Sequence, residues 1–543
     1  MKDFMELTTE ELKKMDKDVL ITMFVALQGQ LKSMNRQLEF ITEQVALMNQ
    51  RSFGKKTEKR DSILDGQLSI DEVFNEAEVK FDNSPEPEIT EILVAPHTRK
   101  QKTKREEKLK DLPARIIEHK LSDEELQELF PNGYKELPYE TYKRLSIIPQ
   151  TFIVDEHHVH VYASKDNNGV IKRAPRSVDL FRNSVATPAL VAAIMNGKYQ
   201  NHLPISRQLK AYKEQGVKLE ENTVSNWMIN ASDNYLSIIY DELHKHLYKC
   251  DVIHADETPF KVIRPDGEDS SKKCYMWVYR NGANETKHPV VLYDYRPGRA
   301  HFYPEEFLKE FSGTVVTDGY QVYHTLGNKR PDLNIAGCWI HAKRRFSDLV
   351  KAVGTENVNG TTSAQAVEKI SNIFHEDKKL KNLSAKKRMK KRQQVVKPLV
   401  DDFFEWLKEI SPSFPSRNHT AEAINYCLNQ ESYLRAFLSN GNIPMDNNSA
   451  ERAIRPFTIG RKNWVNMFST NGAQASAVIY SLVETARANN IRVYDYLELL
   501  LTELPKHVDD KDNSFIQDLL PWSDNIQQKC QAPPKTDINI SMS

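Results

Sequence analysis

Three acidic residues stand in sequence settings where they could perform metal-dependent chemistry. Asp256 in VIHADETPF and Asp318 in GTVVTDGY each end a short run rich in Val and Ile, which is typical of a buried strand. Glu451 in DNNSAERAIRPFTIGRKNW opens a predicted helix that carries several Arg residues. Three carboxylates at one edge of a sheet can hold two Mg²⁺ ions about 3.5–4 Å apart, which clamp the attacking and leaving oxygens of a phosphodiester. The pattern therefore indicates phosphoryl transfer on a polynucleotide.

Each acidic residue taken alone has a simpler interpretation. An Asp directly after a strand is usually a cap or a turn residue, and Glu451 beside Arg452 and Arg455 could be a surface ion pair of little energy. The combination favours a site, because Arg461 and Lys462 follow in the same segment. Cationic side chains around a carboxylate fit a site where DNA phosphates approach bound metal ions.

The runs between these residues predict how the two aspartates meet. Within residues 246–345 the first strand leads to Asp256, and CYMWVYR and PVVLYDYR form a hairpin across Asn281-Gly282. A helix, a fourth strand that leads to Asp318, a short helix and a fifth strand, NIAGCW, follow. This order is that of a ribonuclease-H-like α/β core, in which the centre of the first strand and the end of the fourth lie side by side.

The N-terminal 110 residues are predicted to hold no part of this core. Residues 1–50 form a predicted coiled-coil segment, since apolar residues recur every seven positions over residues 18–50. An amphipathic helix that packs on its own domain is the alternative. Residues 51–110 are predicted to be a flexible charged linker, whose basic ends could touch DNA or serve only as a tether. The two seams are Leu20, Leu27, Met34, Ile41 and Met48, and Phe24, Leu31, Leu38 and Val45.

Two small modules are predicted between the linker and the core. Residues 111–175 should contain a small β module, in which FIVDEHHVHVY alternates and places His158 and His160 on one strand face. No Cys lies nearby to complete a zinc site, so a solvated polar face is the favoured interpretation. Residues 176–245 read as a helix-turn-helix-like domain, with an ordinary helical hairpin as the alternative. Its exposed polar positions are Asn222, Thr223, Ser225 and Asn226.

Several motifs together resemble one known family. The segments HADETP, YRPGRA, TDGYQVY, AGCWIHAKRRF and DNNSAERAIRPFTIGRKNW are similar to those of the insertion-sequence 66 family, a bacterial group of DDE transposases. RSFGKKTEK and HLPISRQ followed by YKEQGV extend the resemblance upstream, so that it covers nearly the whole chain. One departure is plain: family members often carry Cys pairs before the helix-turn-helix, and residues 115–175 contain no Cys. The resemblance therefore implies a zinc-finger-like module here that lacks its Cys ligands.

The resemblance also implies roles for individual residues. Asp256, Asp318 and Glu451 would be the catalytic triad that holds two Mg²⁺ ions, with Mn²⁺ as a substitute. Cys338 and His341 would be a structural signature after the fifth strand. Residues 346–430 would be a helical insertion, residues 431–500 the second part of the core and residues 501–543 a tail. Inside the insertion an acid-free basic run favours phosphate contact over a merely solvated face. This run includes Lys387, Arg388, Lys390 and Lys391.

The whole chain is then expected to be a multidomain α+β protein that works on double-stranded DNA. The 75 basic and 75 acidic residues balance, so DNA contact must come from local clusters. We expect cytoplasmic localisation, because no apolar run could span a membrane and the five cysteines form no CxxC pair. We also expect a homodimer or higher homo-oligomer, with small accessory proteins as further partners. The alternatives to a transposase are an inactive DNA-binding derivative and a nuclease without strand transfer.

Overall fold

The computed structural model describes about seven tenths of the chain. The described residues are 16–31, 150–163, 171–263, 273–282, 287–353, 361–414, 418–510 and 512–531, with a few single positions between 34 and 132. The chain divides into two units, one of residues 1–55 and 159–532 and the other of residues 56–158 and 533–543. All elements named below belong to the first unit. None of the described helices is long and apolar enough to cross a membrane.

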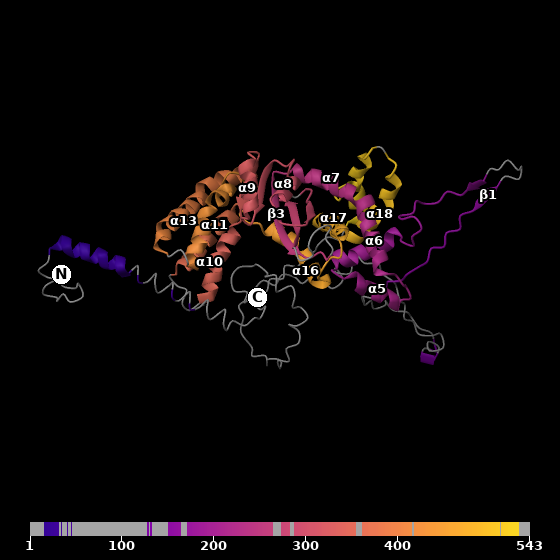
Figure 1. Ribbon diagram of the computed structural model, residues 1–543, viewed down its shortest axis with the longest axis horizontal. Helices are drawn as coiled ribbons and strands as arrows, with labels where there is room; N and C mark the ends of the chain where they lie inside the picture. Colours follow the sequence, from indigo (N-terminus) through magenta and orange to yellow (C-terminus); the bar gives the residue numbers. More distant parts are fainter. Residues whose placement is uncertain are drawn as a thin grey trace. The chain divides into compact units, whose positions relative to one another are not determined.

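A five-stranded mixed sheet forms the centre of the first unit (Figure 1). The strand order is β5-β4-β3-β6-β7, in which β3 pairs antiparallel with β4 and parallel with β6. Most residues of β3, β5 and β6 are buried, as expected of strands covered on both faces. The strands are β3 (Val252–Phe260), β4 (Cys274–Asn281), β5 (Val291–Arg296), β6 (Gly313–Thr317) and β7 (Leu333–Gly337).

The register of the central strand pair sets the position of the acidic residues. In the parallel pair β3–β6, His254 lies opposite Val316. Continuing this register by two residues places Asp256 at the level of Asp318, which directly follows β6. Asp256 at the centre of β3 and Asp318 just past the end of β6 therefore lie side by side.

The hairpin between β4 and β5 differs from the prediction in its connection. The two strands pair antiparallel as expected, but β4 ends at Asn281 and β5 begins only at Val291. The Asn281 side chain spans the connection, because its Nδ2 donates to the His288 carbonyl at 2.9 Å and its Oδ1 accepts from the Val290 N–H at 3.0 Å. The predicted hairpin is confirmed, and Asn281 closes a loop that is longer than a tight turn at Asn281-Gly282.

Helix α17 (Thr470–Ala488) covers the free edge of β5. Ser481 Oγ accepts the Tyr293 N–H at 2.7 Å, and Thr485 Oγ1 both accepts from and donates to the Val291 backbone, at 3.0 and 2.9 Å. These hydroxyls are four residues apart and lie on one helix face. They satisfy backbone groups that an edge strand would otherwise expose.

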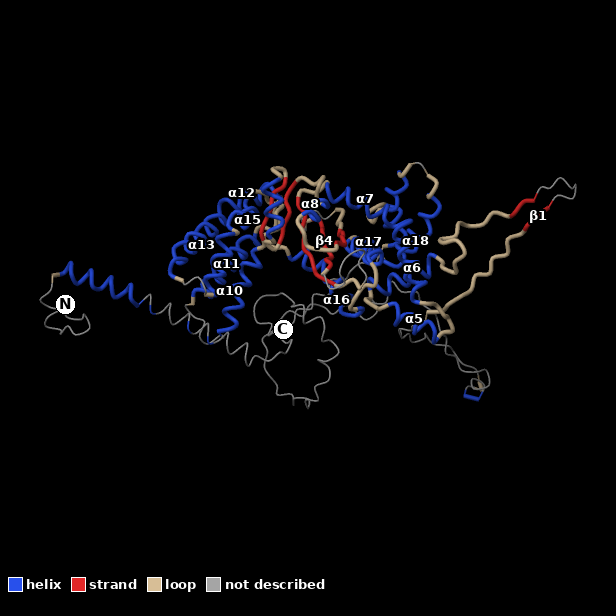
Figure 2. Tube along the Cα trace, viewed as in Figure 1, coloured by secondary structure: helices blue, strands red, loops and turns tan. Residues whose placement is uncertain are grey.

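A helical block adjoins the opposite edge of the sheet, at β7 (Figures 1 and 2). It packs around a buried aromatic cluster in which Trp339 contacts Phe403 and Phe404. This block occupies the part of the chain predicted to be a helical insertion. Its helices are α10 (Trp339–Val353), α11 (Thr362–Lys379), α12 (Ala385–Lys391), α13 (Lys397–Ile410), α14 (His419–Asn429) and α15 (Glu431–Arg435).

The remaining helices lie before, within and after the sheet segments. Helices α5 and α6 pack on each other across a short connection that contains Gly216 at φ +90°, so this predicted helical pair forms. Helix α16, which carries Glu451, packs on β3 and β4. The bounds are α4 (Pro188–Met195), α5 (Ile205–Glu214), α6 (Glu221–Ala231), α7 (Ser237–Tyr248), α8 (Phe302–Phe307), α9 (Gln321–Lys329), α16 (Asn448–Trp464), α18 (Val493–Glu503) and α19 (Asp524–Cys530).

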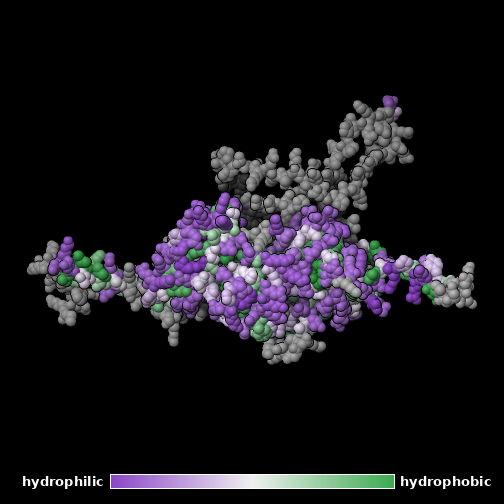
Figure 3. Space-filling model, turned by 90° about the horizontal axis from the view of Figure 1, so that it is seen from above, coloured by the Kyte–Doolittle hydropathy of each residue, from purple (hydrophilic) through white to green (hydrophobic). Residues whose placement is uncertain are grey.

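The N-terminal segment is helical where it is described. Residues 17–31 form a helix whose apolar side chains are exposed, including Phe24, Leu27 and Leu31. Figure 3 shows this apolar surface at the left of the view, and polar residues cover most of the visible face of the described sheet-and-helix region. The helix agrees with the predicted seam, and its pairing with a second chain stays a prediction. The predicted linker of residues 51–110 lies outside the described residues.

The small β module is described only in part. Strands β1 (Val161–Ala163) and β2 (Ile171–Arg173) pair antiparallel, and all six residues are exposed. The strand predicted over FIVDEHHVHVY is too long, because regular structure begins only at Val161. His158 and His160 precede it, and His158 lies 2.9 Å from Glu156 Oε1. Without a buried face, the alternation of this segment has no packing to support a longer strand.

Candidate active site

The structure brings Asp256, Asp318 and Glu451 together beside the central strands. Asp256 lies within β3, Asp318 directly follows β6, and Glu451 lies in the first turn of α16. The charges of Glu257, Asp318 and Glu451 act on the Asp256 carboxyl. Burial first, and then these neighbouring charges, raise the pKa of Asp256 well above its usual range. A group of acids that repel one another in this way is stabilised by a bound cation.

A tight turn fixes the Asp318 carboxylate. Asp318 Oδ1 accepts the Tyr320 N–H at 3.0 Å, and the Asp318 carbonyl accepts the Tyr426 hydroxyl at 3.0 Å. Gly319 between them has φ +95°, and a Cβ built there would lie 2.9 Å from the Tyr426 oxygen. The turn therefore requires glycine, and TDGY is the sequence signal for it.

Asn447 ties the helix that carries Glu451 to the strand that carries Asp256. Its side chain is fully buried, Nδ2 donates to the Ala255 carbonyl at 2.8 Å, and Oδ1 lies 2.9 Å from His254 Nδ1. Its backbone N–H donates to Cys338 Sγ at 3.2 Å. Asn447 thus connects β3, the start of α10 and the N-terminus of α16.

Further contacts hold α16 along the sheet. Arg461 donates to Thr258 Oγ1 at 3.0 Å and to the Pro259 carbonyl, which fixes the C-terminal half of the helix on β3. The Tyr293 hydroxyl donates to the Ala453 carbonyl, and Arg280 reaches the Ser449 carbonyl at 3.4 Å. The predicted DNA-binding residue Arg461 therefore has a packing role in this structure.

A second buried carboxylate, Glu257, lies beside Asp256, and the sequence-based prediction of the site did not include it. Its side chain accepts from Arg299 Nε at 2.8 Å, and Arg299 stacks on the Tyr320 ring at 3.7 Å. Burial raises the pKa of Glu257 to about 7, against the lowering effect of Arg299. In the sequence, the motif HADETP places Glu257 directly after Asp256, and this pair of adjacent acids could have indicated Glu257 as a functional residue.

Cys338, His341 and Glu451 form a compact cluster at the start of α10. One ligand atom from each residue lies within 4.8 Å of the others. His341 Nδ1 lies 3.9 Å from Glu451 Oε1, and Arg344 lies 3.7 Å from Glu451 Oε2. Burial raises the pKa of the Cys338 thiol to about 12, and burial also lowers the pKa of His341. Among the described residues this is the group of His, Cys and acidic side chains best arranged for a metal ion.

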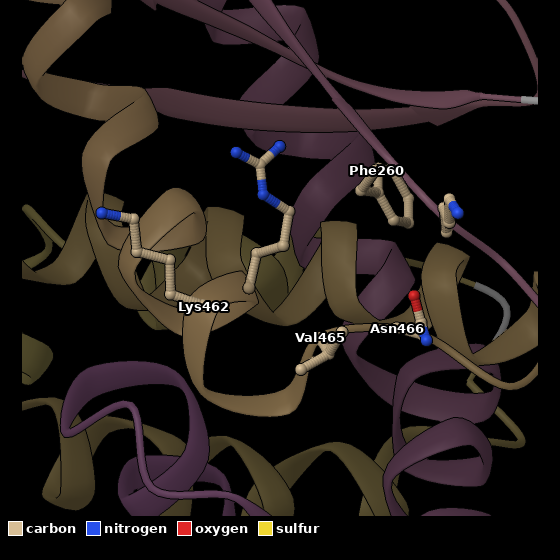
Figure 4. A pocket seen from close by; sticks show the side chains of 6 residues that line it. Phe260, Lys462, Val465 and Asn466 are labelled. Carbon is tan, nitrogen blue, oxygen red and sulfur yellow. The ribbon is translucent and has the colours of Figure 1, made fainter. Parts of the chain in front are cut away.

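The cationic side chains of α16 differ in their exposure to solvent. Arg452 and Lys462 are exposed, and Arg455 is partly buried. Lys462 and Arg461 line an open cavity of about 490 Å³ together with Phe260, Lys261, Val465 and Asn466 (Figure 4).

The other predicted DNA contacts lie on two separate elements. Asn222, Thr223 and Asn226 are exposed on α6, and Ser225 is half-buried there. Lys387, Lys390 and Lys391 are exposed on α12.

Arg388 on the same helix points inward. It is 9% exposed, and its guanidinium donates to the carbonyls of Leu380, Lys381, Leu383 and Gly441. These bonds occupy the guanidinium, so its prediction as a phosphate ligand is corrected to a packing role. Cationic residues occupy most positions of α12, so the sequence alone does not show which face of the helix is buried.

Comparison with known proteins then defines the class. Residues 183–475 match the family described as "Transposase IS66 family", and residues 481–522 match the "IS66 C-terminal element". The chain therefore belongs to the IS66 transposase family, and this membership supports a role as a DNA-transposing enzyme. Residues 41–117 match "Transposase C of IS166 homeodomain", which indicates a homeodomain-like region where the sequence predicted mainly a linker.

Similar chains occur in Sinorhizobium fredii. The uncharacterized protein y4qI is 29% identical over 393 residues, which cover 70% of this chain and 70% of that protein. The uncharacterized protein y4hP is 26% identical over 391 residues, or 70% of this chain and 69% of that protein. The uncharacterized protein y4jD is 26% identical over 400 residues, or 72% of this chain and 76% of that protein.

Proposed function

We propose that this protein is a metal-dependent DNA transposase that cuts at the terminal inverted repeats of a mobile element and joins the ends to target DNA. Asp256, Asp318 and Glu451 would hold two Mg²⁺ ions, for which Mn²⁺ could substitute. The observation that carries the proposal is the convergence of these carboxylates on neighbouring elements, together with the raised pKa of Asp256 beside the other two. Family membership supports the same role.

We further propose that the core is ribonuclease-H-like. The sheet order β5-β4-β3-β6-β7 is the order that this fold requires, with its first three strands antiparallel and the next two parallel to β3. Acids on β3 and after β6 then occupy adjacent positions. Residues 346–430, which lie within the block α10–α15, would then be an insertion between the second Asp and the Glu.

The donor set fits hard divalent cations. Carboxylate oxygens are the ligands that Mg²⁺ and Mn²⁺ prefer, and the acids here converge from three elements. When bound, such ions would activate water and stabilise both the attacking and leaving oxygens of a phosphodiester. The residues of the chain position the reactants: Asn447 fixes the first turn of α16, and the Asx turn fixes Asp318. Arg452, Arg455 and Lys462 would orient DNA phosphates along α16.

We assign DNA binding outside the active site to two exposed surfaces. Asn222, Thr223, Ser225 and Asn226 on α6 would contact the transposon ends, and the exposed lysines of α12 would contact phosphate. The N-terminal helix would pair two chains, because both ends of the element must be brought together before joining. Accessory proteins from the same element are further proposed partners.

Single substitutions in the triad test the proposal. Asp256→Asn, Asp318→Asn and Glu451→Gln should each reduce Mg²⁺-dependent cleavage of end DNA at least a thousandfold, because each removes a charged ligand. Binding of the ends in a gel-shift assay should change less than about threefold. Asp294→Asn is the matched control, since Asp294 is a buried acid on β5, paired with Arg296, and it should keep cleavage. Normal metal-dependent cleavage by any triad variant would contradict the assignment.

Pre-cleaved ends separate a transposase from a nuclease. Supplied with a target plasmid, the wild-type protein should join such ends, and the triad variants should not. Cleavage without any joined product would favour a nuclease, and end binding without cleavage would favour an inactive derivative.

A further inference from the structure

We propose that Cys338, His341 and Glu451 form a second metal site, specific for a borderline-soft divalent cation such as Zn²⁺. This site would share only Glu451 with the proposed Mg²⁺ pair. Its ligands would be one sulfur, one imidazole nitrogen and one carboxylate oxygen, a donor set typical of Zn²⁺ and avoided by Mg²⁺.

Two elements bring the three side chains together. Cys338 directly precedes α10, and His341 lies three residues later, in the first turn of the helix and on the same side as Cys338. Glu451 comes from the first turn of α16, which Asn447 holds against Cys338 through an N–H···S hydrogen bond of 3.2 Å. The ligand atoms lie within 4.8 Å of one another, so small side-chain rotations would bring them to one ion.

The polar atoms that face this cluster have no partner of their own. His341 Nδ1 and Glu451 Oε1 are both buried, and neither makes a hydrogen bond within the described part of the chain. Their separation of 3.9 Å is too long for a hydrogen bond. Buried polar atoms in native proteins normally have a partner, and a cation between nitrogen and oxygen would supply one.

The surroundings of Cys338 Sγ suit a metal ligand. Cys338 Sγ is buried and accepts backbone N–H groups from Asn447 and His341. Such outer hydrogen bonds orient a ligand and stabilise the negative charge of a coordinated thiolate. On coordination the thiol proton would leave to solvent.

Because the two proposed metal sites share Glu451, an ion in one site would affect the reaction at the other. Zn²⁺ binds nitrogen and sulfur ligands much more tightly than Mg²⁺ does. An ion on Cys338 and His341 would therefore draw Glu451 towards α10 and away from the aspartates. We infer that low concentrations of Zn²⁺ inhibit Mg²⁺-dependent cleavage. This effect rests on the proposed function, whereas metal binding itself does not.

Cobalt absorption tests the site without using activity. Co²⁺ takes the ligands of Zn²⁺ and absorbs strongly when a thiolate is bound. The full-length protein titrated with Co²⁺ should show thiolate-to-cobalt charge transfer that Zn²⁺ displaces. Cys338→Ser should abolish this absorption, and it should still fold, because Ser is a good residue at a helix N-terminus. Cys427→Ser is the matched control, since Cys427 is a second fully buried free thiol, and it should keep the absorption.

Two further variants locate the ion. His341→Ala, at a partly exposed position, should weaken Co²⁺ binding more than tenfold, at least the loss that follows removal of an outer-shell partner. Asp256→Asn should keep the absorption even if it abolishes cleavage, which separates this site from the Mg²⁺ pair. Unchanged absorption in Cys338→Ser, unchanged affinity in His341→Ala, or loss of absorption in Asp256→Asn would each overturn the inference. Failure of the proposed function alone would instead leave the cobalt results intact and show no cleavage to inhibit.

Discussion

At the scale of single residues, Asn447 connects the strand that carries Asp256 to the helix that carries Glu451. Its amide replaces water as the partner of the Ala255 carbonyl and of His254, and both groups are inaccessible to solvent. A buried amide in this position fixes both the distance and the direction of the first turn of α16. Leu or Ala at this position would leave the carbonyl without a donor.

Asn447→Ala should therefore lower the free energy of unfolding by about 1–3 kcal/mol, the usual effect of leaving buried polar groups unpaired. The cleavage rate of the folded variant should also fall, beyond what the loss of stability causes, because Glu451 would lose its fixed position. Chemical denaturation and a cleavage assay at a temperature where the variant is folded measure the two effects. Asn334→Ala, at an exposed position on β7, should change neither. Equal cleavage rates for folded Asn447→Ala and wild type would contradict the positioning role.

Glu257 controls the charge of its neighbour Asp256. Burial and the Glu257 charge raise the pKa of Asp256, so a metal-binding ionised form is gained only as pH rises. Glu257→Gln removes the repelling charge and lowers the pKa of Asp256, so it should shift the rising limb of the pH–rate profile to lower pH. Glu306→Gln, which removes an exposed acid paired with Arg296, should leave the profile unchanged. A shift to higher pH in Glu257→Gln would show that the charge acts in another way.

At the scale of elements, the sequence predicted the strands better than the helix faces. Val and Ile runs before Asp256 and Asp318 identified β3 and β6, because a strand covered on both faces must be apolar. The β4–β5 hairpin was predicted, but its connection is longer than a tight turn, and Asn281 acts as a loop clamp. Arg388 was assigned to DNA because a run of cationic residues does not reveal which of them meets backbone carbonyls. Asn447, Glu257 and the packing of Arg461 depend on contacts between distant segments, which no local pattern contains.

Helix α12 should contribute non-specific, salt-dependent DNA binding through its exposed lysines. Replacement of Lys387, Lys390 and Lys391 by Gln should reduce the slope of log affinity against log salt by roughly 0.9 for each lost phosphate contact. Fluorescence anisotropy with random duplex DNA measures this slope. Lys245→Gln with Lys506→Gln, at exposed positions on other elements, is the control. An unchanged slope in the α12 variant would mean that its lysines only face solvent.

Arg388→Met should behave differently from these lysine variants. The buried guanidinium supports four carbonyls, so its loss should cost about 2 kcal/mol or more of stability without a specific change in the salt slope. Thermal unfolding and the same anisotropy assay compare the two effects. A stable Arg388→Met with weaker, less salt-dependent binding would restore the original assignment to DNA.

At the scale of the whole molecule, the exposed apolar side of the N-terminal helix is the feature that a single chain leaves unexplained. Phe24 is 62% and Leu31 57% exposed, on a helix whose apolar residues repeat every seven positions. Pairing with a second chain would bury them and would bring two active sites into one complex. A protein that joins two DNA ends needs such a complex.

Phe24→Asp combined with Leu31→Asp should therefore halve the mass measured by light scattering, because charges would enter the proposed seam. Gln28→Asp, outside the seam, should leave the mass unchanged. A double variant with the wild-type mass would mean that another surface joins the chains. In that case the helix would serve a different partner.

We propose that Asp256, Asp318 and Glu451 together hold two divalent cations. Anomalous diffraction from crystals of the protein with cleaved end DNA and Mn²⁺ tests it most directly. We predict two Mn²⁺ peaks between these carboxylates, about 3.5–4 Å apart, as expected of a two-metal phosphoryl-transfer site. Manganese bound elsewhere, with the three carboxylates in contact with no ion, would show that these residues are not the metal site.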